Sequence, residues 1–172
     1  MSVLLSLDLE TGGLLADRHA ILTVGAVAYQ TATDQVLGEI ELRIHPEDKD
    51  VDAEALAVNG IDIQSHIENS LSRDDAAKQL CDFVQPTWGR VRILGYNVNS
   101  FDIPFVRPWL GETAFRRKFQ YRALDVMDLV MWLNHAKQIA TGGMRLQQVA
   151  AHYSVDVGVA HSALSDAKTT LA

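Results

Sequence analysis

Hydrophobic and polar residues alternate along three stretches in the first part of the chain. Residues 3–10 place four aliphatic side chains on one face, and the opposite face ends in two carboxylates, Asp8 and Glu10. Residues 20–29 are rich in Ile, Leu, Val and Ala, and residues 37–45 alternate again. Short polar turns separate the three stretches, so the pattern predicts three strands joined as an antiparallel meander.

The spacing of apolar residues becomes helical after residue 50. Ser72 with Asp75 resembles a capping box, and an apolar stripe follows it until Pro86. Three strands followed by helices and short strands predict one α/β domain over residues 1–172, with a mixed sheet and helices on both faces. Helices are expected over residues 52–57, 72–84, 127–140, 145–153 and 162–172, strands over residues 91–95 and 122–126, and a short or kinked helix around Pro104 and Pro108.

Composition restricts the class of protein. The chain has 172 residues, of which 48% are hydrophobic and 22% charged, as in a globular domain. It holds no apolar run long enough for a membrane span and no signal-peptide pattern, and Cys81 is its single cysteine, expected to be a buried thiol. We therefore expect a cytoplasmic protein with no membrane partner. A net charge of −7 disfavours general attraction to nucleic acid, so such a partner would be held locally or through bound cations.

The two carboxylates at the end of the first strand point toward metal chemistry. Asp8 and Glu10 lie side by side on one face. Two like charges at such a short distance repel each other unless a cation lies between them. Hard divalent cations prefer oxygen ligands, so the pair is a candidate half of a metal site. Taken alone, the pair is equally consistent with the solvated face of an amphipathic strand.

Two later segments contain further candidate side chains. Asp102 follows a short strand and a polar loop near the start of a helix, where an isolated Asp usually serves as a cap. His161 lies just before the last predicted helix and Asp166 lies on it. An isolated histidine is more often a surface or structural residue. Asp102, His161 and Asp166 therefore indicate a functional site only when they are considered together.

These three segments resemble the motifs of the DEDDh group of 3′-to-5′ exonucleases, which includes the proofreading subunit of bacterial replicative polymerase, ribonuclease T and oligoribonuclease. The D-x-E-T-[TS]-G motif is matched by residues 8–13, although Gly12 replaces the usual Thr or Ser. The second motif is matched by residues 97–105, and the third, H-[SA]-A-x-x-D-[AT], by residues 161–167. The segment A-V-N-G-I resembles V-H-G-I of the family, with Asn59 replacing His.

The resemblance implies an RNase H-like fold and a two-metal hydrolysis of phosphodiester bonds with Mg²⁺ or Mn²⁺. It implies that Asp8, Glu10 and Asp166 hold one metal ion. Asp8 would bridge to a second ion, on which Asp102 acts through water. His161 would be the general base, because an imidazole can accept a proton at neutral pH. The residues expected to bind substrate are Thr11, Gly12, Gly13, Leu14, Asn59, Asn97, Phe101 and Phe105.

The expected function is a metal-dependent 3′-to-5′ exonuclease that releases nucleoside monophosphates from the 3′ end of single-stranded DNA or RNA. A homodimer or a polymerase partner is consistent with the resemblance. The alternatives are an RNase H-like structure-directed endonuclease and a catalytically silent docking module of a replication complex.

Residues 115–122 form the one basic cluster of the chain, interleaved with aromatic residues. The cluster either follows a phosphate backbone while its rings stack on bases, or forms a solvated helix end with its Phe and Tyr side chains buried.

Overall fold

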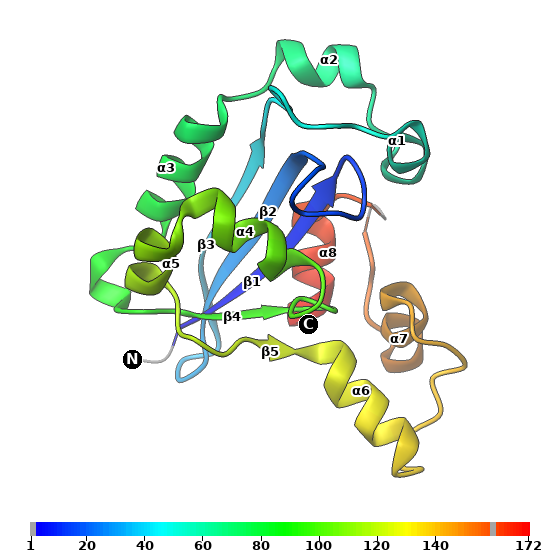
Figure 1. Cartoon of the computed structure of the whole chain (residues 1–172). Helices are drawn as coiled ribbons and strands as arrows, with labels where there is room; N and C mark the ends of the chain where they lie inside the picture. Colours follow the sequence, from blue (N-terminus) through cyan, green and yellow to red (C-terminus); the bar gives the residue numbers. More distant parts are fainter. Residues whose placement is uncertain (1–2, 159–160) are drawn as a thin grey trace.

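A five-stranded mixed sheet forms the centre of the computed structural model, which describes residues 3–158 and 161–172 (Figure 1). Its strand order is β3-β2-β1-β4-β5. The strand β1 is central, pairing antiparallel with β2 and parallel with β4, so the meander and the two further strands are confirmed. The bounds are β1 Val3–Thr11, β2 Ile21–Gln30, β3 Gln35–Arg43, β4 Arg92–Gly95 and β5 Leu124–Asp125.

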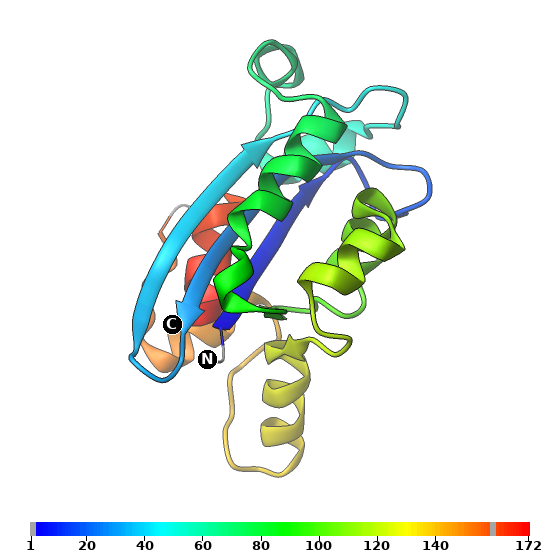
Figure 2. The same ribbon diagram turned by 90° about the vertical axis from the view of Figure 1, so that its left-hand side faces the viewer.

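Helices cover both faces of the sheet, as Figure 2 shows. On one face lie α3 (Arg73–Phe83), α4 (Asp102–Leu110) and α5 (Glu112–Lys118). Their apolar side chains form one core with the aliphatic face of β1, which includes the fully buried Leu5 and Leu7. The helix α8 (Ala163–Leu171) covers the opposite face, where it packs on β1 and β2. The predicted α/β class with helices on both faces is confirmed.

The helix α8 lies unusually close to the sheet because β2 has a glycine beneath it. A Cβ atom on Gly25 would lie 2.1 Å from the backbone nitrogen of Leu164, a distance that real contacts do not reach. Next to this point, the Ser6 hydroxyl of β1 donates a hydrogen bond of 2.7 Å to the carbonyl of Ala167. These two contacts fix α8 against the strand that carries Asp8 and Glu10.

The remaining helices lie around the edges of the sheet (Figure 1). They are α1 (Ala53–Asn59), α2 (Ile63–Glu68), α6 (Val126–His135) and α7 (Leu146–Tyr153), with a 3₁₀ turn η1 at Pro86–Trp88. Among the described residues, no helix is both long and apolar enough to cross a membrane.

The structure corrects several sequence-based expectations. The helix α6 ends at His135 rather than at Ala140, because Asn134 exchanges hydrogen bonds with Thr141 and closes a turn between them. The helices α2 and α5 were not predicted, since each is a short element between polar turns. Cys81 is only partly buried.

Candidate active site

The carboxylates of β1 lie on the face that α8 covers. Asp8 and Glu10 share this face with Ser6, and Glu10 is buried. Asp8 pairs across the sheet with Gly25, the residue that admits α8, so the last helix passes directly beside the two acids. The strand register thus brings the first motif against the last.

Asp102 joins the cluster from the first residue of α4. Its side chain is buried, and its carboxylate accepts hydrogen bonds from the backbone N–H of Leu9 and from its own N–H. The hydrogen bond to Leu9 places Asp102 beside the segment between Asp8 and Glu10. Its Oδ1 atom is nevertheless buried with no hydrogen-bond partner among the described residues. A buried oxygen without a partner costs free energy unless a ligand satisfies it.

The turn before Asp102 is held by a residue that the sequence did not single out for this role. Asp125, at the end of β5, accepts hydrogen bonds from the backbone N–H groups of Asn97 (2.9 Å) and Asn99 (3.0 Å). It also caps α6 through the N–H of Met127. Asp125 therefore both caps α6 and fixes the loop that leads into α4.

His161 and Asp166 complete the site from the start of α8. One nitrogen of His161 and one carboxylate oxygen each of Glu10 and Asp166 lie within 4.8 Å of one another. The Asp166 carboxylate accepts a hydrogen bond from the His161 backbone, and His161 adopts a left-handed φ of 59°. Such a conformation in a non-glycine residue is uncommon and is often found at functional sites. Ser162 occupies the N-cap position as expected, but its hydroxyl donates to Glu41 instead of capping the helix.

The electrostatics of the cluster favour a bound cation. Burial, followed by the charges of Asp102, Glu10 and Asp166, raises the pKa of Asp8 well above its ordinary value. Burial, with repulsion from Asp166, raises the pKa of Glu10 to about 7. Burial raises the pKa of Asp102 to about 8 and also raises the pKa of Asp166. The pKa values stay raised although His161 favours the ionised form of Asp166 and backbone hydrogen bonds favour that of Asp102, so a divalent ion would supply the positive charge that is still needed.

The donor set of the cluster fits divalent metal ions. Four carboxylates and one imidazole converge from three elements, and the Oδ1 atoms of Asp102 and Asp166 are both buried without a hydrogen-bond partner among the described residues. Carboxylate oxygens of this kind are the ligands that Mg²⁺ and Mn²⁺ prefer.

A pocket of about 690 Å³ opens beside the cluster. Of the eight residues predicted to bind substrate, five line it: Thr11, Gly13, Leu14, Asn59 and Phe101. Leu14 is 80% exposed and projects from the loop between β1 and β2, while Phe101 forms part of the wall. Glu10 and His161 also line the pocket, so a bound molecule would touch both the catalytic cluster and this loop.

The other three predicted substrate residues lie outside this pocket. Phe105 is buried with its ring centroid 5.4 Å from that of Phe101, so it supports that ring from beneath. Gly12 contributes backbone hydrogen bonds, accepting from Asp52 and donating to Ala20. Asn97 has a φ of 60° in the turn held by Asp125.

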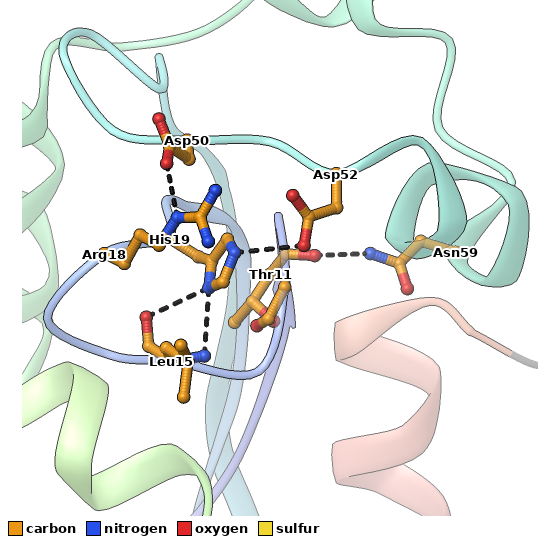
Figure 3. A network of polar contacts seen from close by, with 8 residues as sticks. Thr11, Leu15, Arg18, His19, Asp50, Asp52 and Asn59 are labelled. Atoms are coloured by element: carbon orange, nitrogen blue, oxygen red, sulfur yellow. Dashed lines mark hydrogen bonds and ion pairs between the residues drawn. The ribbon is translucent and has the colours of Figure 1, made fainter.

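A buried histidine that sequence analysis left without a role holds the β1–β2 loop in place (Figure 3). The Nδ1 atom of His19 lies 3.0 Å from the backbone nitrogen of Leu15 and 3.2 Å from its carbonyl oxygen, so the ring contacts both polar groups of that residue. The Nε2 atom of the ring lies 3.0 Å from the Asp52 carboxylate, a close polar contact rather than a well-aligned hydrogen bond. A Cβ on Gly13 would lie 2.5 Å from the ring, so glycine is required there.

The neighbouring contacts join the same loop to α1. The Asn59 amide donates a hydrogen bond of 2.9 Å to the carbonyl of Thr11, and Arg18 forms an ion pair with Asp50 (Figure 3). Asn59, at the position where the family motif has histidine, therefore connects the end of β1 to α1. No sequence signal marked His19 or Asp52, because their meaning depends on a contact across 33 residues of chain.

Comparison with known proteins assigns the family of this site. Residues 5–172 match the sequence model of the RNase_T family, described as exonuclease. The chain belongs to this exonuclease family. The recognition as a DEDDh-type 3′-to-5′ exonuclease is thereby confirmed.

Individual relatives agree with the family assignment. The 3′-5′ DNA exonuclease Cap18 of Escherichia coli is 24% identical over 170 residues, covering 96% of this chain and 86% of Cap18. E. coli exonuclease I in complex with a dT13 oligonucleotide superposes with a TM-score of 0.84 at 19% identity, over 99% of this chain and 40% of that one. Its zinc-bound complex with single-stranded DNA gives a TM-score of 0.85 at 19% identity, over 99% and 39%. The exonuclease domain thus spans about two-fifths of the exonuclease I chains it resembles.

Proposed function

We propose that this exonuclease removes nucleoside monophosphates one at a time from the 3′ end of single-stranded nucleic acid, using two divalent metal ions. The observation that carries the proposal is the convergence of four carboxylates and His161 beside a pocket that the β1–β2 loop encloses. Cap18 is named a DNA exonuclease and the exonuclease I structures hold DNA oligonucleotides, so we place DNA before RNA as the substrate.

The proposed roles of the acidic residues are those that the family resemblance implies. Asp8, Glu10 and Asp166 would hold one metal ion, and Asp8 with Asp102 would hold the other. When bound, such ions neutralise charge on the phosphate oxygens and make attack by water easier. The backbone hydrogen bonds to Asp102 and Asp166 keep these two carboxylates oriented before substrate arrives.

His161 would serve as the general base. Its imidazole lies near Glu10 and Asp166 and remains exposed to the pocket, so it can take a proton from an attacking water and pass it to solvent. Its helix-entry position leaves the ring free of the packing that fixes Asp166.

The pocket would select the terminal nucleotide. Thr11 and Gly13 line the pocket beside Glu10, Leu14 is placed to wedge against the last base, and Phe101 offers a ring for stacking. Asn59 acts through its hydrogen bond to the Thr11 carbonyl, which fixes the loop. We further propose that residues 1–172 form one exonuclease domain acting in the cytoplasm, alone, as a homodimer or beside a polymerase.

The experiment that tests this proposal uses single-stranded DNA and RNA labelled at the 5′ or the 3′ end, with Mg²⁺ or Mn²⁺. We expect a 3′ label to leave as a mononucleotide in the first turnover and a 5′ label to remain on progressively shorter products. Cleavage of a closed circular strand would instead indicate the endonuclease alternative. No cleavage of any substrate in either metal would favour a docking module.

A further inference from the structure

A basic surface of the molecule lies away from the active site. A cavity of about 510 Å³ is lined by Arg90, Arg92, Gln120, Tyr121 and Arg122, and we call it the arginine hollow. Three of its five residues are cations and none is an acid. This composition is unusual in a chain with a net charge of −7.

The hollow forms because two distant segments run side by side. The N–H of Val91 donates to the carbonyl of Lys118 (3.0 Å), and the N–H of Gln120 donates to the carbonyl of Val91 (2.8 Å). Since Val91 is buried, its neighbours Arg90 and Arg92 both point outward in this extended segment. Arg92 Nη1 then donates to the Arg122 carbonyl (2.9 Å), which brings the third arginine into the group.

The arginines of the hollow differ from several other arginines of the chain in their partners. Elsewhere, Arg18, Arg107 and Arg116 pair with Asp50 or Glu112. Within residues 3–158 and 161–172, by contrast, no ion pair engages the arginines of the hollow. Cations gathered without acids repel one another, and an anionic ligand would relieve this repulsion.

The sequence cluster at residues 115–122 is divided by the fold. Arg116 pairs with Glu112, and the Lys118 ammonium donates to the carbonyl of Val84, so these two side chains make contacts outside the hollow. Phe115 and Phe119 are buried, as the solvated-helix alternative predicted. Tyr121 is instead 78% exposed, with the Arg107 guanidinium 5.8 Å from its ring centroid. An exposed ring between arginines is a surface on which a nucleic-acid base can stack.

We propose that the arginine hollow binds the phosphodiester backbone of the substrate strand upstream of its 3′ end. This inference rests on the proposed function for the identity of the strand. Arg92 pairs with Leu4 in the parallel ladder, four residues before Asp8, which separates the two sites by about 13 Å along the strand. At about 3.4 Å per phosphate in a stacked strand, a strand whose 3′ end lies at the carboxylates reaches the hollow with about four nucleotides, so a dinucleotide does not reach it.

The test compares substrate lengths in a double variant, Arg90→Gln with Arg122→Gln. For single-stranded DNA of about 30 nucleotides we expect KM to rise about fivefold to tenfold, and the slope of log affinity against log salt to fall by about 1.4. For a dinucleotide, which is too short to reach the hollow, we expect no change in KM or kcat. The matched control, Arg117→Gln with Lys137→Gln, removes two exposed cations outside the hollow and should leave both lengths unaffected.

The outcomes separate this inference from the proposed function. Equal effects of the two double variants, or equal effects on both lengths, would overturn the hollow as a strand-binding site. Equally tight, Arg90- and Arg122-dependent binding of polyglutamate would assign the hollow to acidic proteins. If the wild-type protein cleaves neither length, the proposed function fails. The affinity of metal-free protein for the long strand then still reports on the hollow.

Discussion

The two ends of the parallel strands β1 and β4 contrast in charge and in how their side chains are held. At the carboxyl end, Asp8, Glu10, Asp102 and Asp166 crowd together, and the last two are oriented by backbone N–H groups. At the amino end, Arg92 is anchored to a backbone carbonyl, while Arg90 and Arg122 carry exposed charge. One sheet therefore carries a cluster of acids suited to bind cations at one end and a group of arginines suited to bind anions at the other. The net charge of the whole chain is negative.

The contrast shows why net charge is a poor guide to the partners of this chain. Surplus acid on the remaining surface repels a long phosphate backbone, so only sites with a local excess of positive charge can hold one. Bound metal ions would provide that excess at the carboxyl end, and arginines provide it at the amino end. Substitutions at the carboxyl end and at the amino end of these strands should therefore have different effects on activity and binding.

The largest effect is expected from Asp8→Asn. Losing this carboxylate should lower kcat by about 10³-fold or more at saturating metal, because both metal positions depend on it. The fold should persist, and the metal-free Tm should rise, since one repelled carboxylate is removed. Asp48→Asn, which neutralises an exposed loop carboxylate, is the control. Activity of Asp8→Asn within tenfold of wild type would contradict this assignment.

The next largest effect is expected from His161→Ala. If His161 is the general base, kcat should fall by about 10²- to 10⁴-fold, and the rise of the rate with pH on the acidic side should disappear. Titration calorimetry with Mn²⁺ should show metal affinity largely retained. An unaltered pH–rate profile in this variant would place the base elsewhere.

The carboxylate cluster should also make stability depend on pH when metal is removed. The folded-state pKa values of Glu10 and Asp102 are raised to about 7 and about 8, so between pH 4 and 8 the folded protein binds more protons than the unfolded chain. The free energy of unfolding should therefore fall as pH rises through this range, by about 3 kcal/mol from Glu10 alone, with Asp102 adding to the fall.

Denaturant unfolding in a chelator measures this slope. Saturating Mg²⁺ should flatten it, and so should Asp8→Asn, which removes one source of repulsion. Arg92→Gln, at the other end of the same sheet, should leave the slope unaltered. Rising stability from pH 4 to 8 in chelator would show that the cluster is already neutralised by the protein.

The smallest effect is expected from His19→Asn. Loss of the contacts to Leu15 and Asp52 loosens the β1–β2 loop, so KM for single strands of every length should rise by about tenfold, equivalent to about 1.4 kcal/mol. The change should fall on KM more than on kcat, because the carboxylates do not move. His152→Asn, on an exposed histidine of α7, is the control. A fall in kcat with KM unaltered would show that His19 acts on the chemical step.

Sequence reasoning reached the parts of this molecule that depend on local pattern. The alternation in residues 3–10 predicted β1 and the common face of Asp8 and Glu10, and Ser72 marked the start of α3. The order of three motifs led to Asp102, His161 and Asp166, which the structure brings beside β1.

Features that depend on tertiary contacts could not be predicted in this way. The end of α6 is set by the Asn134–Thr141 hydrogen bonds. The position of the β1–β2 loop depends on the contact between His19 and Asp52. The arginine hollow exists because Val91 lies beside Phe119, which joins arginines that are about 30 positions apart in the chain. Local composition instead indicated residues 115–122, where two of the four cations, Arg116 and Lys118, serve other contacts.

The Ser6–Ala167 hydrogen bond has a consequence for the timing of activity. Its two residues are 161 positions apart, and Asp8 and Asp166 are separated almost as widely. A chain emerging from the ribosome contains Asp8 and Glu10 early, but the carboxylate cluster is incomplete until the helix α8 has been synthesised and has packed on Gly25. If these residues act as proposed, a nascent chain would not cleave nearby nucleic acid before its synthesis has passed residue 166.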